Sequence, residues 1–311
     1  MERITLKKIK LNYIFSRDKK SIFRTTILYP MANIQQLKDL STQIRRDILR
    51  MVNAVASGHP GGSMGCTEYF VALYFDIMKH NPAFHMDGAN EDLFFLSNGH
   101  ISPVFYSTLA RSGYFDVAEL ATFRKLNTRL QGHPTTHEHL PGIRMASGSL
   151  GQGLSVALGA AKTKKMNGDP SLVFSLHGDG EFQEGQIWEA LMFGAQFKLD
   201  NVIATMDYNG KQIDGDTDDV ISLGDIEAKI KAFGWDTMWI ENGNDIEQVL
   251  AGLNEAKART GKGKPVFVIM RTQMAYGVDF MQGQGKWHGN APSNEQLEKA
   301  LAQLPETVGD Y

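Results

Sequence analysis

The sequence predicts an α/β protein with a parallel sheet that is covered by helices on both faces. Short, mostly apolar runs, such as 172–176, 202–206 and 266–270, alternate with longer segments of helical periodicity. Strands that are apolar on both sides are typical of a parallel sheet between two layers of helices. The chain has 311 residues, 42% of them hydrophobic, and is long enough to bury a sizeable core.

The individual elements follow from the same periodicities, taken in chain order. A helix is predicted from Asn33 to about Ala56, and the run Gly58-His-Pro-Gly-Gly ends it. A helix, a strand and a closely packed helix rich in Ala, Leu and Gly are then predicted at Thr67–Met78, Leu93–Leu96 and Leu150–Lys165. The second half alternates, with strands over Leu172–Leu176, Val202–Met206, Thr237–Ile240 and Val266–Met270 and helices over Ile187–Phe197, Ile226–Phe233, Ile246–Lys257 and Asn294–Leu301.

Composition and charge narrow the class of protein. The chain has 32 Lys and Arg residues against 35 Asp and Glu residues, a net charge of −3, which argues against a general nucleic-acid binder. It contains no apolar run long enough to span a membrane. Its one cysteine, Cys66, excludes an intrachain disulfide and suits a reducing compartment. We therefore expect a cytoplasmic protein that binds neither nucleic acid nor membrane.

Residues 1–30 differ from the rest of the chain. They hold eight Lys or Arg residues and two acids, and they lack the apolar stretch of a signal peptide. A good helical pattern begins at Met31, directly after Pro30. We expect residues 31–311 to form the functional domain, with 1–30 as a basic leader that is either disordered or an over-long start of the gene.

Polar side chains that follow predicted strands are the candidates for chemistry. In a doubly wound sheet, ligands bind beyond the carboxyl ends of the strands. His100, Asp179 and Asn209 each follow a predicted strand end. The strands before Asp179 and Asn209 are joined by one crossover helix, so neighbouring strands would bring both side chains to one edge of the sheet.

Asp179 and Asn209 together suggest a magnesium site that holds a diphosphate. Mg²⁺ prefers oxygen ligands and often shares them with substrate phosphates. Gly180 allows a diphosphate to approach the main chain, and the next helix offers free N–H groups. The alternative is a pair of ordinary Asp-Gly and Asn-Gly turns, but the placement of Asn209 after a second strand favours the metal site.

Several motifs resemble one family of enzymes. The stretch from His177 to Gly210 resembles the thiamine-diphosphate signature, in which Gly-Asp-Gly is followed about thirty residues later by Asn. Further stretches resemble transketolase in chain order and cover about residues 35–300: GHPGGSMG, LSNGHISP, GHP, GSLGQG, NGKQIDG and WHGNAP. The resemblance implies a thiamine-diphosphate-binding fold, specifically the diphosphate-binding domain, with thiamine diphosphate and Mg²⁺ or another divalent cation as cofactors.

The resemblance also implies roles for particular residues. The metal would be held by Asp179, Asn209 and the backbone carbonyl of Lys211. The cofactor would be bound by His100 at its diphosphate, by Leu150 at its rings, and by Gly148, Gly180, Asn209 and His288. Among the catalytic residues, His59 and His288 would contact the donor's oxygens and handle protons, and His133 would bind the donor's terminal hydroxyl. Without the motifs, these histidines would be interpreted as loop residues that cap turns.

The length of the chain departs from the family. Transketolases are about twice as long, and their second part binds the aminopyrimidine and supplies the glutamate that activates the cofactor. We therefore expect the N-terminal subunit of a split transketolase, which acts in the pentose phosphate pathway as a heterotetramer. It would transfer a two-carbon ketol unit from a ketose phosphate to an aldose phosphate, and only together with a C-terminal subunit. Glu184 resembles an acid at the family's subunit interface; the alternative is an exposed helical Glu.

Three alternatives remain open at this point. One is another split thiamine enzyme, such as a 2-oxo-acid dehydrogenase α-subunit or a deoxyxylulose-phosphate synthase, although GHPGGSMG and WHGNAP favour transketolase. The second is a non-catalytic regulatory homologue, against which the intact Asp179, Asn209 and histidines argue. The third is a fragment of a longer gene, but the chain runs through its last predicted helix into a short polar tail.

Overall fold

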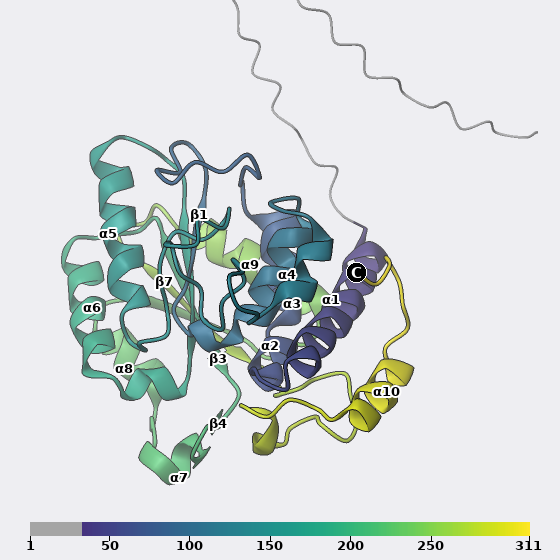
Figure 1. The fold of residues 1–311 in the computed structure, drawn as a ribbon. Helices are drawn as coiled ribbons and strands as arrows, with labels where there is room; N and C mark the ends of the chain where they lie inside the picture. The colour runs from purple at the N-terminus through teal and green to yellow at the C-terminus, as the bar shows by residue number, and fades with distance from the viewer. Residues whose placement is uncertain (1–32) are drawn as a thin grey trace, which may run out of the picture. The chain divides into compact units, whose positions relative to one another are not determined.

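The computed structural model describes residues 33–311, and a five-stranded parallel sheet lies at its centre (Figure 1). The expected boundary between leader and domain at residue 30 lies outside the described residues. The strand order is β1-β2-β3-β7-β6, and every neighbouring pair is parallel. The strands span Leu93–Leu96 (β1), Val173–Gly178 (β2), Val202–Tyr208 (β3), Asp236–Ile240 (β6) and Val266–Arg271 (β7). The predicted fold class is confirmed.

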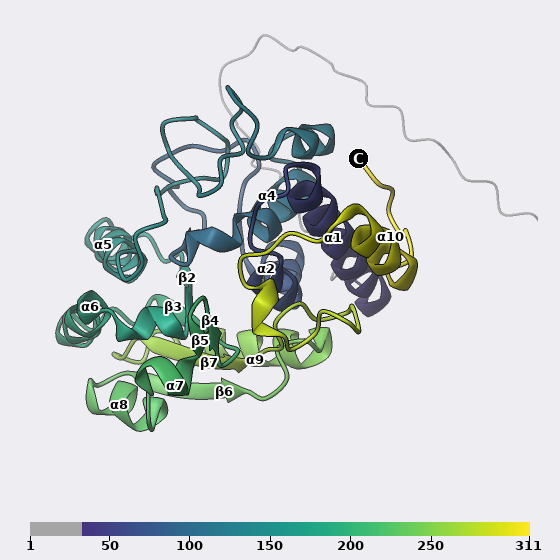
Figure 2. The same cartoon turned by 60° about the horizontal axis from the view of Figure 1, so that its bottom comes forward.

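Helices cover both faces of this sheet, as Figure 2 shows from below. One layer contains α5 (Gly153–Met166), α6 (Gly185–Gln196) and α8 (Ile226–Ala232). The other contains α1 (Ile34–Ala54), α2 (Pro60–Gly65), α3 (Thr67–Ala72), α4 (Ser102–Arg111) and α9 (Ile246–Arg259). A last helix, α10 (Asn294–Gln303), packs on α1.

Alternate side chains of a strand contribute to two hydrophobic cores, one on each face of the sheet. In β1, Leu93 and Phe95 join the core beneath α5 and α6, whereas Phe94 and Leu96 join the core beneath the opposite layer. Successive side chains of a strand point to opposite faces, so a strand buried on both sides is mostly apolar along its length. This is why the apolar runs of the sequence predicted the strands correctly.

Three helices were missed, namely α2, α4 and the short α7 (Thr217–Ile221), and the predicted helices Thr67–Met78 and Leu150–Lys165 were too long. The Gly-rich segment 60–65 was interpreted as the end of a helix, but Pro60 occupies the first turn of α2, where its missing N–H needs no partner. Helix α4 begins in the same way, with Pro103 in its first turn. The predicted helix Thr67–Met78 remains α-helical only to Ala72 and continues as a π-helical turn over Leu73–Ile77.

The connections at the carboxyl ends of the strands place the candidate residues. Short 3₁₀ turns follow β1 at Gly99–Ile101 and β2 at Gly180–Gln183, and another lies at Gly285–Trp287. A small hairpin of β4 (Lys211–Gln212) and β5 (Gly215–Asp216) follows β3 and leads into α7 (Thr217–Ile221). Within the described part of the chain, no helix combines the length and apolarity of a membrane span.

Two glycines on neighbouring helices offer a matched test of this packing. A Cβ on Gly194 of α6 would lie 2.7 Å from Cζ2 of Trp235 and 3.1 Å from Cδ2 of Leu158. We expect Gly194→Ala to lower the free energy of unfolding by about 1–3 kcal/mol through overpacking. Gly159→Ala on α5 meets no atom within 4 Å, so it should raise that free energy by about 0.5–1 kcal/mol. Urea unfolding of both variants measures the difference, and equal effects would contradict the close packing at Gly194.

Candidate functional site

A solvent-connected cleft of about 350 Å³ opens where the strands end, and its walls come from several loops. The loops after β1, β2 and β3 contribute, together with the segment before α5 and two segments from the last third of the chain. Of the residues predicted for the site, all except His133 line this cleft: His59, His100, Gly148, Leu150, Asp179, Gly180, Asn209, Lys211 and His288.

Two buried carboxylates face each other at the floor of the cleft. Strands β2 and β3 pair so that Gly178 lies opposite Asp207, which places Asp179 just beyond. The Asp179 carboxylate accepts hydrogen bonds from the N–H groups of Gly180 (2.7 Å) and Gly210 (2.6 Å). Burial, and then the charge of Asp207, nevertheless raise the pKa of Asp179 to about 7. A divalent cation at this point would relieve that repulsion.

Asn209 is held in one orientation beside these acids. Its Nδ2 donates to Oδ2 of Asp207 (2.8 Å), and its Oδ1 accepts from the N–H of Lys211 (2.9 Å). The Lys211 ammonium is paired with Asp216 at 2.5 Å, in the adjoining hairpin. The arrangement agrees with a role for Lys211 through its main chain rather than its ammonium.

Three imidazoles gather on the opposite wall. The ring centroids are 5.1 Å apart for His59 and His100, 5.8 Å for His59 and His288, and 5.2 Å for His100 and His288. Burial lowers the pKa of all three rings; for His59, further lowered by the neighbouring His288 and Arg124, it falls to about 4. Near pH 7 these rings are neutral, so each can donate one hydrogen bond and accept another.

His133 lies at the rim of the cleft rather than in it. Its side chain is exposed, and its ring centroid is 6.3 Å from that of His59. The ring packs against the loop before α5, where a Cβ on Gly148 would lie 3.3 Å from it. Gly148 also has a φ of +146°, which side chains rarely adopt, so the loop depends on glycine here.

Several residues in the cleft escaped the sequence analysis. Asn98 and Asp207 both line it, yet neither was singled out, although each lies two residues from a predicted one. The Oδ1 of Asn98 and the Nδ1 atoms of His59 and His288 are buried without a hydrogen-bond partner among the described residues. Buried polar atoms are normally satisfied, so these three atoms suit a polar ligand.

Glu181 is the third missed residue, and it is 1% exposed. Burial opposes its ionisation, but the nearby His177 ring and the hydrogen bonds from Ser97 and Gly151 outweigh burial and hold the pKa of Glu181 below its usual value. The signal in the sequence is only a lone acid after Gly-Asp-Gly, which has no distinguishing pattern.

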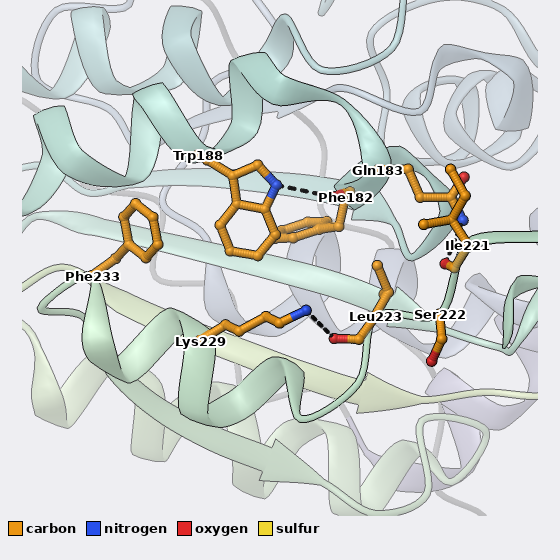
Figure 3. A pocket seen from close by; sticks show the side chains of 8 residues that line it. All are labelled: Phe182, Gln183, Trp188, Ile221, Ser222, Leu223, Lys229 and Phe233. Atoms are coloured by element: carbon orange, nitrogen blue, oxygen red, sulfur yellow. Dashed lines mark hydrogen bonds between the residues drawn. The ribbon is translucent and has the colours of Figure 1, made fainter.

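A second hollow, of about 460 Å³, opens between α6 and α8 (Figure 3). It is lined by Phe182, Gln183, Trp188, Ile221, Ser222, Leu223, Lys229 and Phe233. The ammonium of Lys229 in this lining already has a hydrogen-bond partner, since its Nζ donates to the carbonyl oxygen of Leu223 at 2.8 Å. With no carboxylate or imidazole in its lining, this hollow lacks the acid–base groups that the cleft provides.

Comparison with known proteins agrees with the geometry of the cleft. Residues 37–305 match the family model for the transketolase thiamine diphosphate binding domain. The chain is 36% identical over 275 residues to one subunit of the apulose-4-phosphate transketolase of Phocaeicola vulgatus, covering 88% of this chain and 96% of that protein. It is 38% identical over 274 residues to the 6-deoxy-6-sulfo-D-fructose transketolase subunit SqwG of a Clostridium species, covering 87% and 98%.

A solved structure shows the same relationship. The crystal structure of transketolase from Campylobacter jejuni superposes with a TM-score of 0.80 at 32% identity, over 88% of this chain but 43% of that one. Fold and cleft thus define a thiamine-diphosphate-binding domain. The chain belongs to the transketolase family, and the expectation that it corresponds to the first part of a full-length transketolase is confirmed.

The lowered pKa of His59 predicts a pH-dependent contribution to stability. Its folded value of about 4 lies below the ordinary 6.5, so the unfolded chain binds the proton more readily between these values. The stabilisation that His59 contributes as a neutral ring is therefore fully present above pH 6.5, and it is lost as the pH falls towards 4. Between pH 7.5 and 5.5 the loss should be about 1 kcal/mol.

The measurement compares wild type with His59→Gln by urea unfolding across this range. Asp179 acts in the opposite sense, because its raised pKa makes stability fall as the pH rises from 3.8 through about 7. The difference between the two proteins, rather than either curve alone, therefore isolates His59. A difference that stays constant with pH would contradict the assignment of a neutral, partly buried ring.

Proposed function

We propose that this chain is the diphosphate-binding subunit of a two-chain transketolase. With a C-terminal, pyrimidine-binding partner it would transfer a two-carbon ketol unit from a ketose to an aldose. The observation that carries this proposal is the single cleft that collects the metal, cofactor and imidazole residues expected of the family. The two relatives that are themselves subunits, matched over almost their whole length, support the division into two chains.

The residues of the cleft fit thiamine diphosphate with a divalent cation, which we propose to be Mg²⁺. Asp179, Asn209 and the carbonyl of Lys211 offer oxygen ligands, and the repulsion between Asp179 and Asp207 favours a cation at Asp179. Gly180 and His100 would hold the diphosphate, with Gly148, Leu150 and His288 beside the rest of the cofactor. When bound, thiamine diphosphate supplies the electron sink for making and breaking the carbon–carbon bond.

The chain's own contribution would be to bind the sugar and move protons. His59 and His288 stand close together as neutral rings, and each has a buried Nδ1 without a partner among residues 33–311. A neutral imidazole accepts a proton from a sugar hydroxyl and returns it near neutral pH. His133, exposed at the rim, would bind the far end of the donor, its terminal hydroxyl.

An apolar face on α5 and α6 supports the existence of a partner subunit. Four large apolar side chains on these adjacent helices, and a fifth directly after α6, are at least 37% exposed: Val156, Met166, Met192, Phe193 and Phe197. Two of them, Phe193 and Phe197, lie side by side with ring centroids 4.5 Å apart, and exposed apolar surface of this kind marks interaction sites. Both helices begin beside the cleft, since Leu150 and Glu184, just before them, line it. We propose that a partner covers this face, within a heterotetramer.

The names of these two relatives point to a class of sugar substrate. Their names specify apulose 4-phosphate and 6-deoxy-6-sulfo-D-fructose, which both carry a terminal anionic group, a phosphate or a sulfonate. We propose a ketose with such a group as the donor, with the sugars of the pentose phosphate pathway as the second candidate. We further propose a cytoplasmic location, and a domain over residues 31–311 preceded by a basic leader.

The decisive experiment is an assay with and without the partner subunit. The chain alone should show no ketol transfer at any cofactor concentration, because the family places the activating glutamate in the other half. Adding a C-terminal transketolase subunit should restore turnover of a ketose phosphate or sulfoketose donor. Full activity of the lone chain would overturn the two-chain proposal, and inactivity of the complex with every donor would favour a regulatory homologue.

Asp179→Ala tests the metal site. The variant removes a charged ligand, so Mg²⁺-dependent binding of thiamine diphosphate to the two-chain complex should fall by a factor of a hundred or more, while the fold survives. Titration calorimetry measures the affinity, and Asp76→Ala, which alters an exposed acid outside the cleft, serves as the control. Unchanged affinity in Asp179→Ala would remove this residue from the site.

His133→Ala tests the assignment at the rim. Loss of a hydrogen bond to the donor should raise the free energy of the transition state by about 1–3 kcal/mol. It should therefore lower kcat/KM for the ketose roughly 5- to 150-fold. Cofactor affinity should change less than about twofold, because His133 does not line the cleft. His137→Ala, in the same loop, is the matched control. If the variant weakens only the cofactor, the assigned role of His133 is wrong.

A further inference from the structure

A single buried carboxylate connects three of the segments that form the cleft. Glu181 lies in the 3₁₀ turn after β2 and is 1% exposed. It accepts hydrogen bonds from the hydroxyl of Ser97, from the N–H of Gly151 at 2.7 Å and from the N–H of Gly178 at 3.2 Å. These donors come from the loop after β1, from the loop before α5 and from the end of β2.

Each of these donors lies next to a residue that lines the cleft. Asn98 follows Ser97, Leu150 precedes Gly151, and Asp179 follows Gly178. The wall on the β1 side, the Leu150 loop and the metal-binding turn are therefore fixed relative to one another through the same two oxygen atoms of Glu181.

The surroundings leave this carboxylate little freedom. The Oγ of Ser97 also accepts from the N–H of Gly153, the first residue of α5, at 3.1 Å. A Cβ on Gly153 would lie only 2.4 Å from that oxygen, so the helix start and Ser97 are in close contact. On the other side, Nδ1 of His177 lies 3.7 Å from Oε2 of Glu181, and Nε2 of His177 is 2.9 Å from Oγ of Ser175.

We propose that Glu181 is a positioning residue that sets the Leu150 loop relative to the turn carrying Asp179. Its carboxylate would thereby place Leu150 against the rings of the cofactor while Asp179 holds the metal and the diphosphate. This role rests on the proposed function, and it adds to it a residue that acts on ring binding through the loop before α5. In this role Glu181 would act through the loop and would not contact the sugar.

The chemistry of the three donors explains why an acid is needed. A hydroxyl and two backbone N–H groups all offer protons, and a carboxylate accepts on both oxygens. Glu181→Gln keeps the shape but turns one oxygen into an NH₂ group, which must face a donor. Hydrogen bonds to a charged acceptor are stronger than neutral ones, so the loop should loosen although the side chain still fits.

The test compares two ligands that share the diphosphate group, of which only thiamine diphosphate carries the rings. Binding of thiamine diphosphate and of inorganic diphosphate, each with Mg²⁺, is measured by calorimetry on the two-chain complex. Glu181→Gln should weaken thiamine diphosphate about tenfold or more and inorganic diphosphate less than about threefold. Ser97→Ala, a smaller change that removes one link of the same network, should act in the same direction. Glu189→Gln, an exposed acid on α6, should change neither.

A double variant identifies Leu150 as the intermediary. Leu150→Ala should also discriminate between the two ligands, and adding Glu181→Gln to it should weaken thiamine diphosphate by less than about threefold more. Full additivity of the two changes would show that Glu181 does not act through Leu150. Equal weakening of both ligands in Glu181→Gln would show that the residue only supports the turn that binds the diphosphate. Full additivity or equal weakening would each overturn the proposal.

Hydrogen exchange tests the positioning role without any ligand. In the full chain, amides of residues 148–156 should exchange faster in Glu181→Gln than in wild type, whereas those of α9 should not change. Unaltered exchange in the loop would overturn the proposal even if the protein binds cofactor. Failure of the wild-type complex to bind thiamine diphosphate would instead overturn the proposed function, so the two failures are distinguishable.

Discussion

The parallel register of β2 and β3 is the constraint on which the rest of the site depends. It sets Asp179 beside Asp207, both almost fully buried, where two negative charges repel each other and burial opposes ionisation. Hydrogen bonds from main-chain N–H groups and from Asn209 hold this arrangement, and the neutral imidazoles of His59, His100 and His288 form the opposite wall. A cleft that combines two acids in mutual repulsion with three neutral rings suits an anion bound through a cation, together with a sugar.

The sheet, and the positions of Asp179 and Asn209 at its edge, were predictable because their signals are local. A strand buried on both faces is a mostly apolar run, and the residues after it lie at the edge of the sheet, which was sufficient to place Asp179 and Asn209 there. Helices α2 and α4 were missed because Gly and Pro usually mark helix ends, and here a proline opens each helix instead. Leu150 was expected within a helix, but α5 begins at Gly153 and leaves Leu150 free to line the cleft.

The residues that escaped prediction act through distant contacts. Glu181 owes its environment to Ser97 and Gly151, which are 84 and 30 residues away in the chain, so nothing near it in the sequence indicates its burial. Asp207 lies within β3, where an acid is unexpected until Thr272 and Asn209 are seen to satisfy it. His133 was singled out from a motif. Its position at the rim, however, depends on the path of a long loop through Gly148, which sequence periodicity does not describe.

The apolar face of α5 and α6 gives the proposed two-chain enzyme a thermodynamic property that a single-chain transketolase lacks. When both halves belong to one polypeptide, the linker holds them at a high effective concentration, of order millimolar for short flexible connections. Separate chains meet only at the concentration that the cell maintains. The strength of the contact at Val156, Met166, Met192, Phe193 and Phe197 would therefore set the dilution at which the cleft loses its second wall, and specific activity would depend on protein concentration.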